Sequence, residues 1–180
     1  FFLNGMCLSY FSTSWKNFSD VQLDISNDRF LSIMGSCSSL FNGLGRIFWS
    51  SWMDRNKSYK LTMGCMTFCA TILLSTWPLL WVLKYIDPIL VKIFSIVWLS
   101  GLFFSICGSF SVFPTQVTWI YGSNNNGVVY GLLFSSMLPS AIIGTFGIIY
   151  IKQALGYYAT SWSFAVCGLA AFILAMKSKK

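Results

Sequence analysis

The 180-residue sequence is strongly apolar, with 56% hydrophobic residues, 18% aromatic residues and only 9% charged residues. A soluble domain carries about a quarter charged residues, so this chain lacks the polar surface that water requires. Its long apolar runs predict transmembrane helices. The net charge of +7 does not indicate nucleic-acid binding, because the basic residues sit mainly at the ends of apolar runs and form no stripe interleaved with aromatics.

Six apolar segments follow one another along the chain. The first opens with Phe1 and is too short, at 1.5 Å per residue, to cross a hydrocarbon core of ~30 Å, so we expect it to be the end of a span. The predicted fold class is all-α, a polytopic membrane helix bundle. Its spans are predicted at about residues 1–14 (partial), 30–53, 61–83, 89–120, 128–151 and 157–176.

Polar residues and prolines mark the boundaries of these spans. A solvent-exposed loop is expected after Ser14, with Asp28 as the N-cap of the second span. Pro88 is expected to start the fourth span. At about 48 Å, the segment 89–120 must tilt, kink at Pro114 or protrude.

The distribution of basic residues predicts the orientation of the bundle. Six spans place the loop 54–60 and the C-terminus on the same side of the membrane. That side is predicted to be cytoplasmic by the positive-inside rule. Its basic residues are Arg55, Lys57, Lys60, Lys177, Lys179 and Lys180.

The sequence offers few residues that could catalyse a reaction or bind a metal ion. The six cysteines lie in apolar runs, where a thiol behaves as a small hydrophobe, and there is no histidine or glutamate to complete a metal site. General acid-base catalysis needs a titratable group near neutral pH, and the spans offer neither histidine nor a carboxylate. We therefore expect no catalytic residue, no metal and no cofactor.

The second span carries polar or small residues at intervals of three and four, which places them on one helix face. They are Ser32, Ser36, Ser39, Asn42 or Gly43, and Arg46. Arg46 lies about 12 Å inside the end of this helix, and all five aspartates lie in loops or at span ends. An intramembrane arginine normally faces a cavity and finds a partner. Backbone carbonyls, an acid from outside this chain, or the carboxylate of an anionic substrate remain possible partners.

Two further segments carry polar faces that could complete a cavity. Equally, these residues could form hydrogen bonds between helices. The faces comprise Ser105, Ser109, Val112 and Gln116 on the fourth span, and Tyr130, Ser136 and Ser140 on the fifth.

The stretch from Phe41 to Arg55, with Asn-Gly-x-Gly-Arg followed by Asp-Arg, resembles the eighth span and following loop of major facilitator superfamily transporters. It is most similar to the oxalate/formate antiporter and monocarboxylate transporter branch. Phe113-Pro114-Thr115, Tyr121-Gly122 and Tyr130-Gly131-Leu132-Leu133 resemble its tenth and eleventh spans. The resemblance implies that residues 1–180 are the C-terminal six-span half of such a transporter, and that an N-terminal half precedes them.

The resemblance also implies roles for individual residues. Arg46 matches the arginine that binds the substrate carboxylate, and Asp54 and Arg55, with Lys60, match a loop that latches the cytoplasmic side. Asn42 stands where monocarboxylate carriers have an aspartate, which leaves coupling to a proton open. No base occupies the interior of the fifth span, where oxalate carriers use a lysine, so a monocarboxylate is favoured over a dicarboxylate.

We therefore predict a secondary transporter that moves a small monocarboxylate-like anion by alternating access. Its expected partners are the lipid bilayer, the solute and, if transport is proton-coupled, a proton. The predicted substrate-binding residues are Arg46, Asn42, Ser39, Gln116, Tyr130 and Ser136. The alternatives are a carrier of amino acids or other solutes, and a receptor or scaffold that transports nothing.

Overall fold

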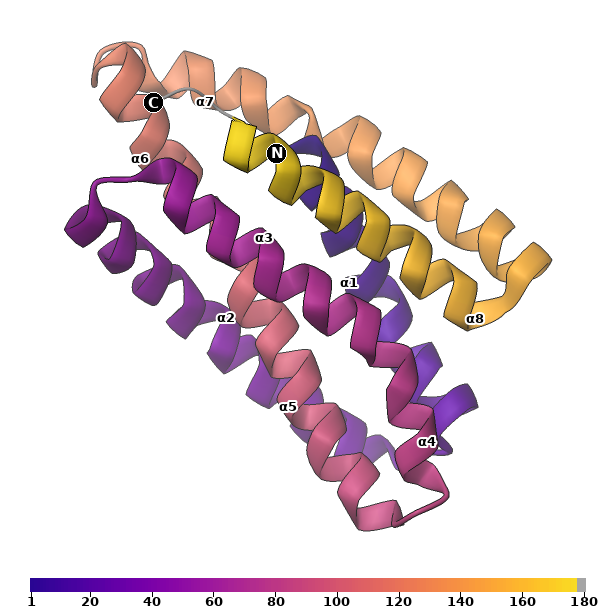
Figure 1. The fold of residues 1–180 in the computed structure, drawn as a ribbon. Coiled ribbons are helices and arrows are strands. Elements are labelled where there is room, and N and C mark those ends of the chain that lie inside the picture. Colours follow the sequence, from indigo (N-terminus) through magenta and orange to yellow (C-terminus); the bar gives the residue numbers. More distant parts are fainter. Residues whose placement is uncertain (178–180) are drawn as a thin grey trace.

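The computed structural model describes residues 1–177, and these residues confirm the predicted all-helical class (Figure 1). The elements are α1 (Phe2–Leu23), α2 (Asp28–Asn56), α3 (Tyr59–Thr76), the 3-10 helix η1 (Trp77–Leu79), α4 (Leu80–Lys84), α5 (Pro88–Cys107), α6 (Ser109–Tyr121), α7 (Asn126–Ser135) and α8 (Met137–Lys177).

The helices form a bundle of long, roughly antiparallel rods. The rods are α1, α2, α3 continued through η1 into α4, α5 continued into α6, α7 continued into the first part of α8, and the second part of α8 (Figure 1). The chain reverses inside α8 at Gly156, which has φ 82° and ψ −177°, a backbone conformation that glycine adopts at no steric cost. The two parts of α8 then lie side by side.

Three segments of the described chain are long and apolar enough to cross a membrane, namely Tyr59–Lys84, Pro88–Tyr121 and Asn126–Lys177. The last has 52 residues, and about 78 Å of helix exceeds twice the hydrocarbon core, which its reversal at Gly156 explains. Helix α2 is long enough, with 29 residues, but the polar face that the sequence predicted lowers its overall apolar character.

Close backbone contacts fix α2 against α5 and α6. A Cβ atom on Gly45 would lie 2.4 Å from the backbone oxygen of Phe104, and one on Gly108 would lie 2.4 Å from the Trp49 ring. The indole nitrogen of Trp49 donates a hydrogen bond to the Phe104 backbone oxygen at 2.9 Å. Only residues without a side chain allow this approach, and the contact determines which faces of α2 stay free.

The first helix is longer than the sequence predicted. Helix α1 continues to Leu23, so the solvent-exposed loop expected after Ser14 is reduced to residues 24–27. Phe18 and Leu23 are fully or almost fully buried, and continuing the helix buries them. The N-cap of α2 is Asn27, not Asp28: its side-chain oxygen accepts hydrogen bonds from the backbone nitrogens of Arg29 and Phe30.

The long fourth and fifth segments each contain a break. The break in 89–120 falls at Gly108, between α5 and α6, while the expected kink site Pro114 lies inside α6. The segment 128–151 divides at Ser136, three residues before Pro139. Pro139 removes one backbone donor and crowds the carbonyl four residues earlier, which explains the break at Ser136.

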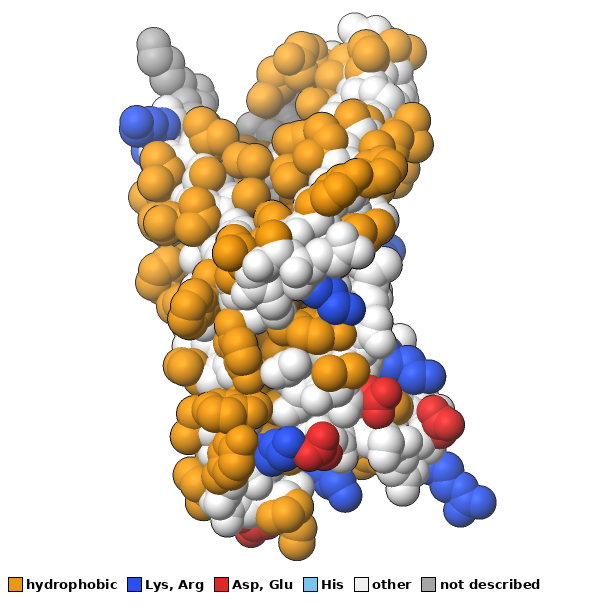
Figure 2. All heavy atoms as spheres, turned by 90° about the vertical axis from the view of Figure 1, so that its right-hand side faces the viewer, with side chains coloured by type: hydrophobic (Ala, Val, Ile, Leu, Met, Phe, Trp, Pro, Cys, Tyr) orange, Lys and Arg blue, Asp and Glu red, His pale blue; other side chains and the backbone are white. Residues whose placement is uncertain are grey.

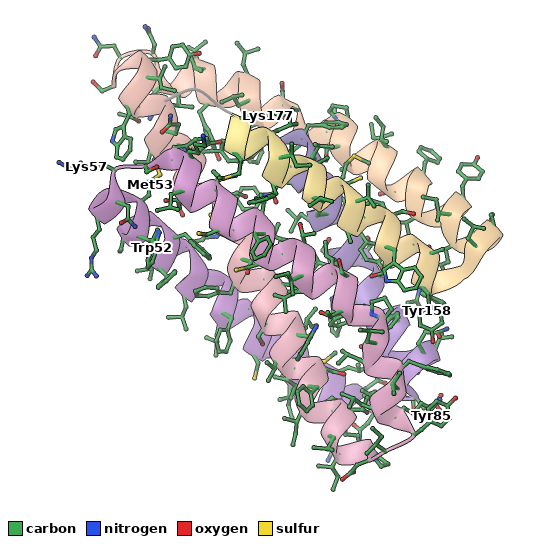
Figure 3. All side chains as sticks on the ribbon, viewed as in Figure 1. Trp52, Met53, Lys57, Tyr85, Tyr158 and Lys177 are labelled. Carbon is green, nitrogen blue, oxygen red and sulfur yellow. The ribbon has the colours of Figure 1, made fainter. Side chains whose placement is uncertain are left out.

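The loop between α2 and α3 and the end of α8 lie at the same end of the bundle. The sulfur of Met176 lies 3.0 Å from where a Cβ on Gly64 would be, and Figure 3 labels Lys57 and Lys177 at this end, with Tyr85 and Tyr158 toward the other. Lys179 and Lys180, which entered the orientation prediction, lie outside the described residues.

The opposite end of the bundle carries ion pairs. Lys84 pairs with Asp24, which joins the α4–α5 and α1–α2 connections, and Lys16 lies 3.6 Å from Asp28. Figure 2 shows the acidic and most of the basic side chains in the lower half of the face it displays, with further basic side chains at mid-height and at the upper left, while hydrophobic side chains cover much of the rest. Such a distribution is typical of a helix bundle in a bilayer.

Candidate substrate-binding site

Helix α2 has three distinct sides when its residues are projected at about 100° per residue. The buried side packs on neighbouring helices and includes Leu31, Met34, Ser38, Gly45 and Trp49. The second side is exposed and apolar, with Ile33, Leu40, Phe41, Leu44 and Ile47. The third side is exposed or half-buried and polar or small, with Ser32, Ser36, Ser39, Asn42, Gly43 and Arg46. The polar stripe predicted from the spacing is therefore one continuous free face.

The serines of this polar face satisfy their own hydroxyl donors. Each donates to the backbone oxygen four residues earlier: Ser32 to Asp28 at 2.8 Å, Ser36 to Ser32 at 2.8 Å, and Ser39 to Gly35 at 2.9 Å. Their hydroxyl oxygens still have acceptor capacity. The face thus tolerates water or a polar solute, and Arg46 is its single cation.

Two neighbours orient the Arg46 side chain. Its Nε donates to the side-chain oxygen of Asn42 at 3.1 Å, one helical turn away. The guanidinium carbon lies 5.3 Å from the ring centroid of Phe110 on α6, within the range of a cation–π interaction. The Ser111 hydroxyl donates to the Arg46 backbone oxygen at 2.9 Å, so α6 is joined to α2 at this level.

Arg46 has no carboxylate partner among residues 1–177, where the ion pairs are Lys16 with Asp28 and Lys84 with Asp24. A guanidinium has five N–H donors, and the bond to Asn42 uses the one on Nε. Four donors remain on the two terminal nitrogens. Their planar fork matches the two oxygens of a carboxylate.

An aromatic wall extends from Arg46 across α6 and α7. The rings of Phe110 and Phe134 have centroids 6.2 Å apart, and those of Tyr130 and Phe134 are 5.8 Å apart. The structure therefore brings Arg46, Asn42 and Tyr130 into one region. The sequence alone did not identify Phe110 or Phe134, since aromatic residues in apolar spans carry no local signal for a site.

The other predicted substrate-binding residues are not hydrogen-bonded to Arg46. Ser39 bonds within its own helix, and Ser136 donates to the Leu133 backbone oxygen at 2.7 Å, at the break between α7 and α8. Gln116 is half-buried on α6, and its buried amide oxygen has no partner within the described chain. These three residues remain predictions for the site.

Some of the polar residues considered for the cavity wall join helices instead. Asn4 on α1 donates to the Ser109 hydroxyl on α6 at 2.8 Å, and Ser140 on α8 donates to the Phe2 backbone oxygen at 3.0 Å. Ser105 and Val112 are buried. For Ser109 and Ser140, interhelical hydrogen bonding is the role that the contacts give.

The predicted latch residues lie at the α2–α3 connection. Asp54 and Arg55 are exposed and Lys60 is half-buried, and within residues 1–177 none of the three forms an ion pair. Their role as a latch stays a prediction.

Comparison with curated proteins finds a carrier that is similar over most of the chain. Apicoplast pyruvate carrier 1 of Toxoplasma gondii is 28% identical over 158 residues, which cover 85% of this chain and 26% of the carrier. The chain thus spans about a quarter of the length of this relative. No protein-family model and no solved structure matches the chain.

Proposed function

We propose that this chain belongs to a secondary transporter that carries a small monocarboxylate across a membrane, with Arg46 binding the carboxylate. The observation that carries the proposal is the state of Arg46: an exposed guanidinium, oriented by Asn42 and Phe110, with its terminal nitrogens unused by any carboxylate of the described chain. An arginine left in this state at membrane depth is costly, and a carboxylate ligand would relieve that cost.

The similarity to an apicoplast pyruvate carrier supports a small organic acid as the solute. Pyruvate carries one carboxylate, which fits a site with a single cation. The aromatic wall of Phe110, Phe134 and Tyr130 would face the small apolar remainder of such a solute. The coupling ion is a second part of this proposal, because Asn42 cannot exchange a proton as a carboxyl group could.

The motif from Phe41 to Arg55 supports the proposal that this chain is the C-terminal six-span half of a major facilitator superfamily transporter. In that arrangement the polar face of α2 would meet an N-terminal half across a central cavity, and the two halves would rock about the bound solute. The α2–α3 connection, with Asp54, Arg55 and Lys60, would lie on the cytoplasmic side as a latch. A carrier of amino acids would use the same arginine but needs an additional partner for the ammonium group.

Uptake by the full-length protein in proteoliposomes tests this proposal. Labelled pyruvate, lactate, oxalate and a neutral amino acid are offered in parallel, with protein-free vesicles as the control. We expect saturable uptake of pyruvate or lactate that exceeds uptake of oxalate. Absence of flux for every carboxylate in a well-folded preparation would favour a scaffold or receptor and would overturn the proposal.

A further inference from the structure

A long groove follows the seam between α2 and α5, on the apolar exposed side of α2. It consists of two hollows of about 410 Å³ and about 350 Å³. Leu44, Ile47, Phe48, Ser51, Trp52, Arg55 and Phe104 line the first, and Phe41, Ile96, Val97, Ser100, Gly101 and Phe104 line the second. Because Phe104 lines both, the two hollows adjoin at this residue, and together they lie across α2 from the Arg46 face.

The lining of this groove changes character along its length. The α5 half is almost entirely apolar. The other half ends at Arg55, Ser51 and Trp52, which lie on one face of the last turns of α2. Within the described chain, Arg55 has no ion pair, and neither the Ser51 hydroxyl nor the Trp52 indole nitrogen donates a hydrogen bond. Polar donors are thus available at one end only.

The dimensions of the groove match one leaflet of a bilayer. From Phe41 to Arg55 the rise along α2 is about 21 Å, and one leaflet with its headgroup region contributes about half of a bilayer thickness of ~40–45 Å. Arg55 is in the last turn of α2, and Lys57 follows directly after this helix. Tryptophan is enriched at the membrane–water interface, which places Trp52 and Arg55 at headgroup depth.

We propose that this groove binds one anionic glycerophospholipid from the surrounding bilayer. Its phosphate is bound by the guanidinium of Arg55, with Ser51 and Trp52 as additional donors, and one acyl chain lies along Phe48, Phe104 and Val97. An arginine fork suits a phosphate, and cationic residues near the surface attract anionic lipids. The site is separate from Arg46, and its occupancy does not depend on which solute is carried.

The test measures which lipid stays bound to the full-length protein. The protein is reconstituted with equal amounts of phosphatidylglycerol and phosphatidylcholine, extracted with mild detergent and analysed by native mass spectrometry. We expect one phosphatidylglycerol to be retained in preference to phosphatidylcholine. Arg55→Gln should lower its retention about tenfold, in the range expected for loss of a charge-assisted hydrogen bond.

Matched variants probe the acyl-chain part of the groove and the headgroup part separately. Val97→Trp fills the groove at an exposed position and should also lower retention, while Arg55, Ser51 and Trp52 stay intact. Lys57→Gln and Asp54→Asn change neighbouring charges that do not line the groove, and both should retain the lipid within about twofold. Equal retention of the two lipids, unchanged retention in Arg55→Gln, or an equal loss in Lys57→Gln would overturn the proposal.

Discussion

Two regions of the molecule differ in how their charged side chains are paired. One is the bundle end formed by the α1–α2 and α4–α5 connections, and the other is the free sides of α2. At the bundle end, Lys84 and Lys16 have carboxylate partners in Asp24 and Asp28. On α2, the guanidinium groups of Arg46 and Arg55 have none among residues 1–177. An unpaired charge in water costs little, whereas one at membrane depth is expensive. The proposed function assigns the missing partner of Arg46 to the carboxylate of the solute.

Removal of Arg46 should have the largest effect. We expect Arg46→Ala to lower the initial rate of carboxylate uptake by about a hundredfold or more, since truncating one member of a desolvated charge pair costs about 2–5 kcal/mol. Initial rates in proteoliposomes measure this. Arg29→Ala removes an exposed arginine at the start of the same helix and should keep uptake within about twofold. Similar losses in both variants would mean that net charge, not the position of Arg46, matters.

A carboxylate placed beside Arg46 would make the α2 face resemble the ion-paired end of the bundle. Because the Asn42 side chain already contacts Arg46 at 3.1 Å, Asn42→Asp should supply an internal partner and weaken solute binding about tenfold. Asn42→Ala, which only removes one hydrogen bond, should weaken it about three- to fivefold. KM values from uptake measure both effects. Tighter binding in Asn42→Asp would contradict the idea that the solute is the missing anion.

Loss of the aromatic contact should have a smaller effect. Phe110→Leu keeps an apolar side chain on α6 but removes the ring 5.3 Å from the Arg46 guanidinium. A cation–π interaction contributes about 0.5–1 kcal/mol, so KM should rise about two- to fivefold with little change in kcat. Phe94→Leu on α5, which packs near Trp98, is the matched control and should leave KM unchanged. An equal effect in the control would assign Phe110 to packing alone.

Removal of an ion pair at the bundle end should have the smallest effect. Lys84 is half-buried, but its partner Asp24 is exposed to solvent, so Lys84→Gln should change thermal stability only slightly, and less in high salt. Uptake should stay unchanged. Thermal unfolding at two salt concentrations, together with uptake, measures this, and a loss of transport as large as that in Phe110→Leu would show that this end takes part in the transport cycle.

Much of the fold follows from composition and local spacing. The low charge content and the apolar runs predicted an all-helical chain, and intervals of three and four predicted the free polar face of α2. Spacing could not predict that Phe18 and Leu23 are buried by neighbours and extend α1, or that the fourth segment breaks at Gly108 beside Trp49. Both depend on contacts between distant segments.

The candidate site shows the same division. Arg46 and Asn42 are one turn apart in sequence, so their pairing could be anticipated from helix geometry. Phe110 lies beside Arg46 where α6 packs on α2, a tertiary contact with no local signature in the sequence. The groove at Arg55 has no signature in the sequence for the same reason, because α5 supplies one of its walls.

The affinity of pyruvate for the full-length protein and for Arg46→Lys, measured by isothermal titration calorimetry, decides whether Arg46 binds the carboxylate. Lysine keeps the positive charge but lacks the planar fork that binds a carboxylate through two nitrogens. We predict that Arg46→Lys binds pyruvate at least about tenfold more weakly, the change expected for loss of one of two charge-assisted hydrogen bonds. Equal affinities for the two proteins would contradict a carboxylate-binding role for Arg46.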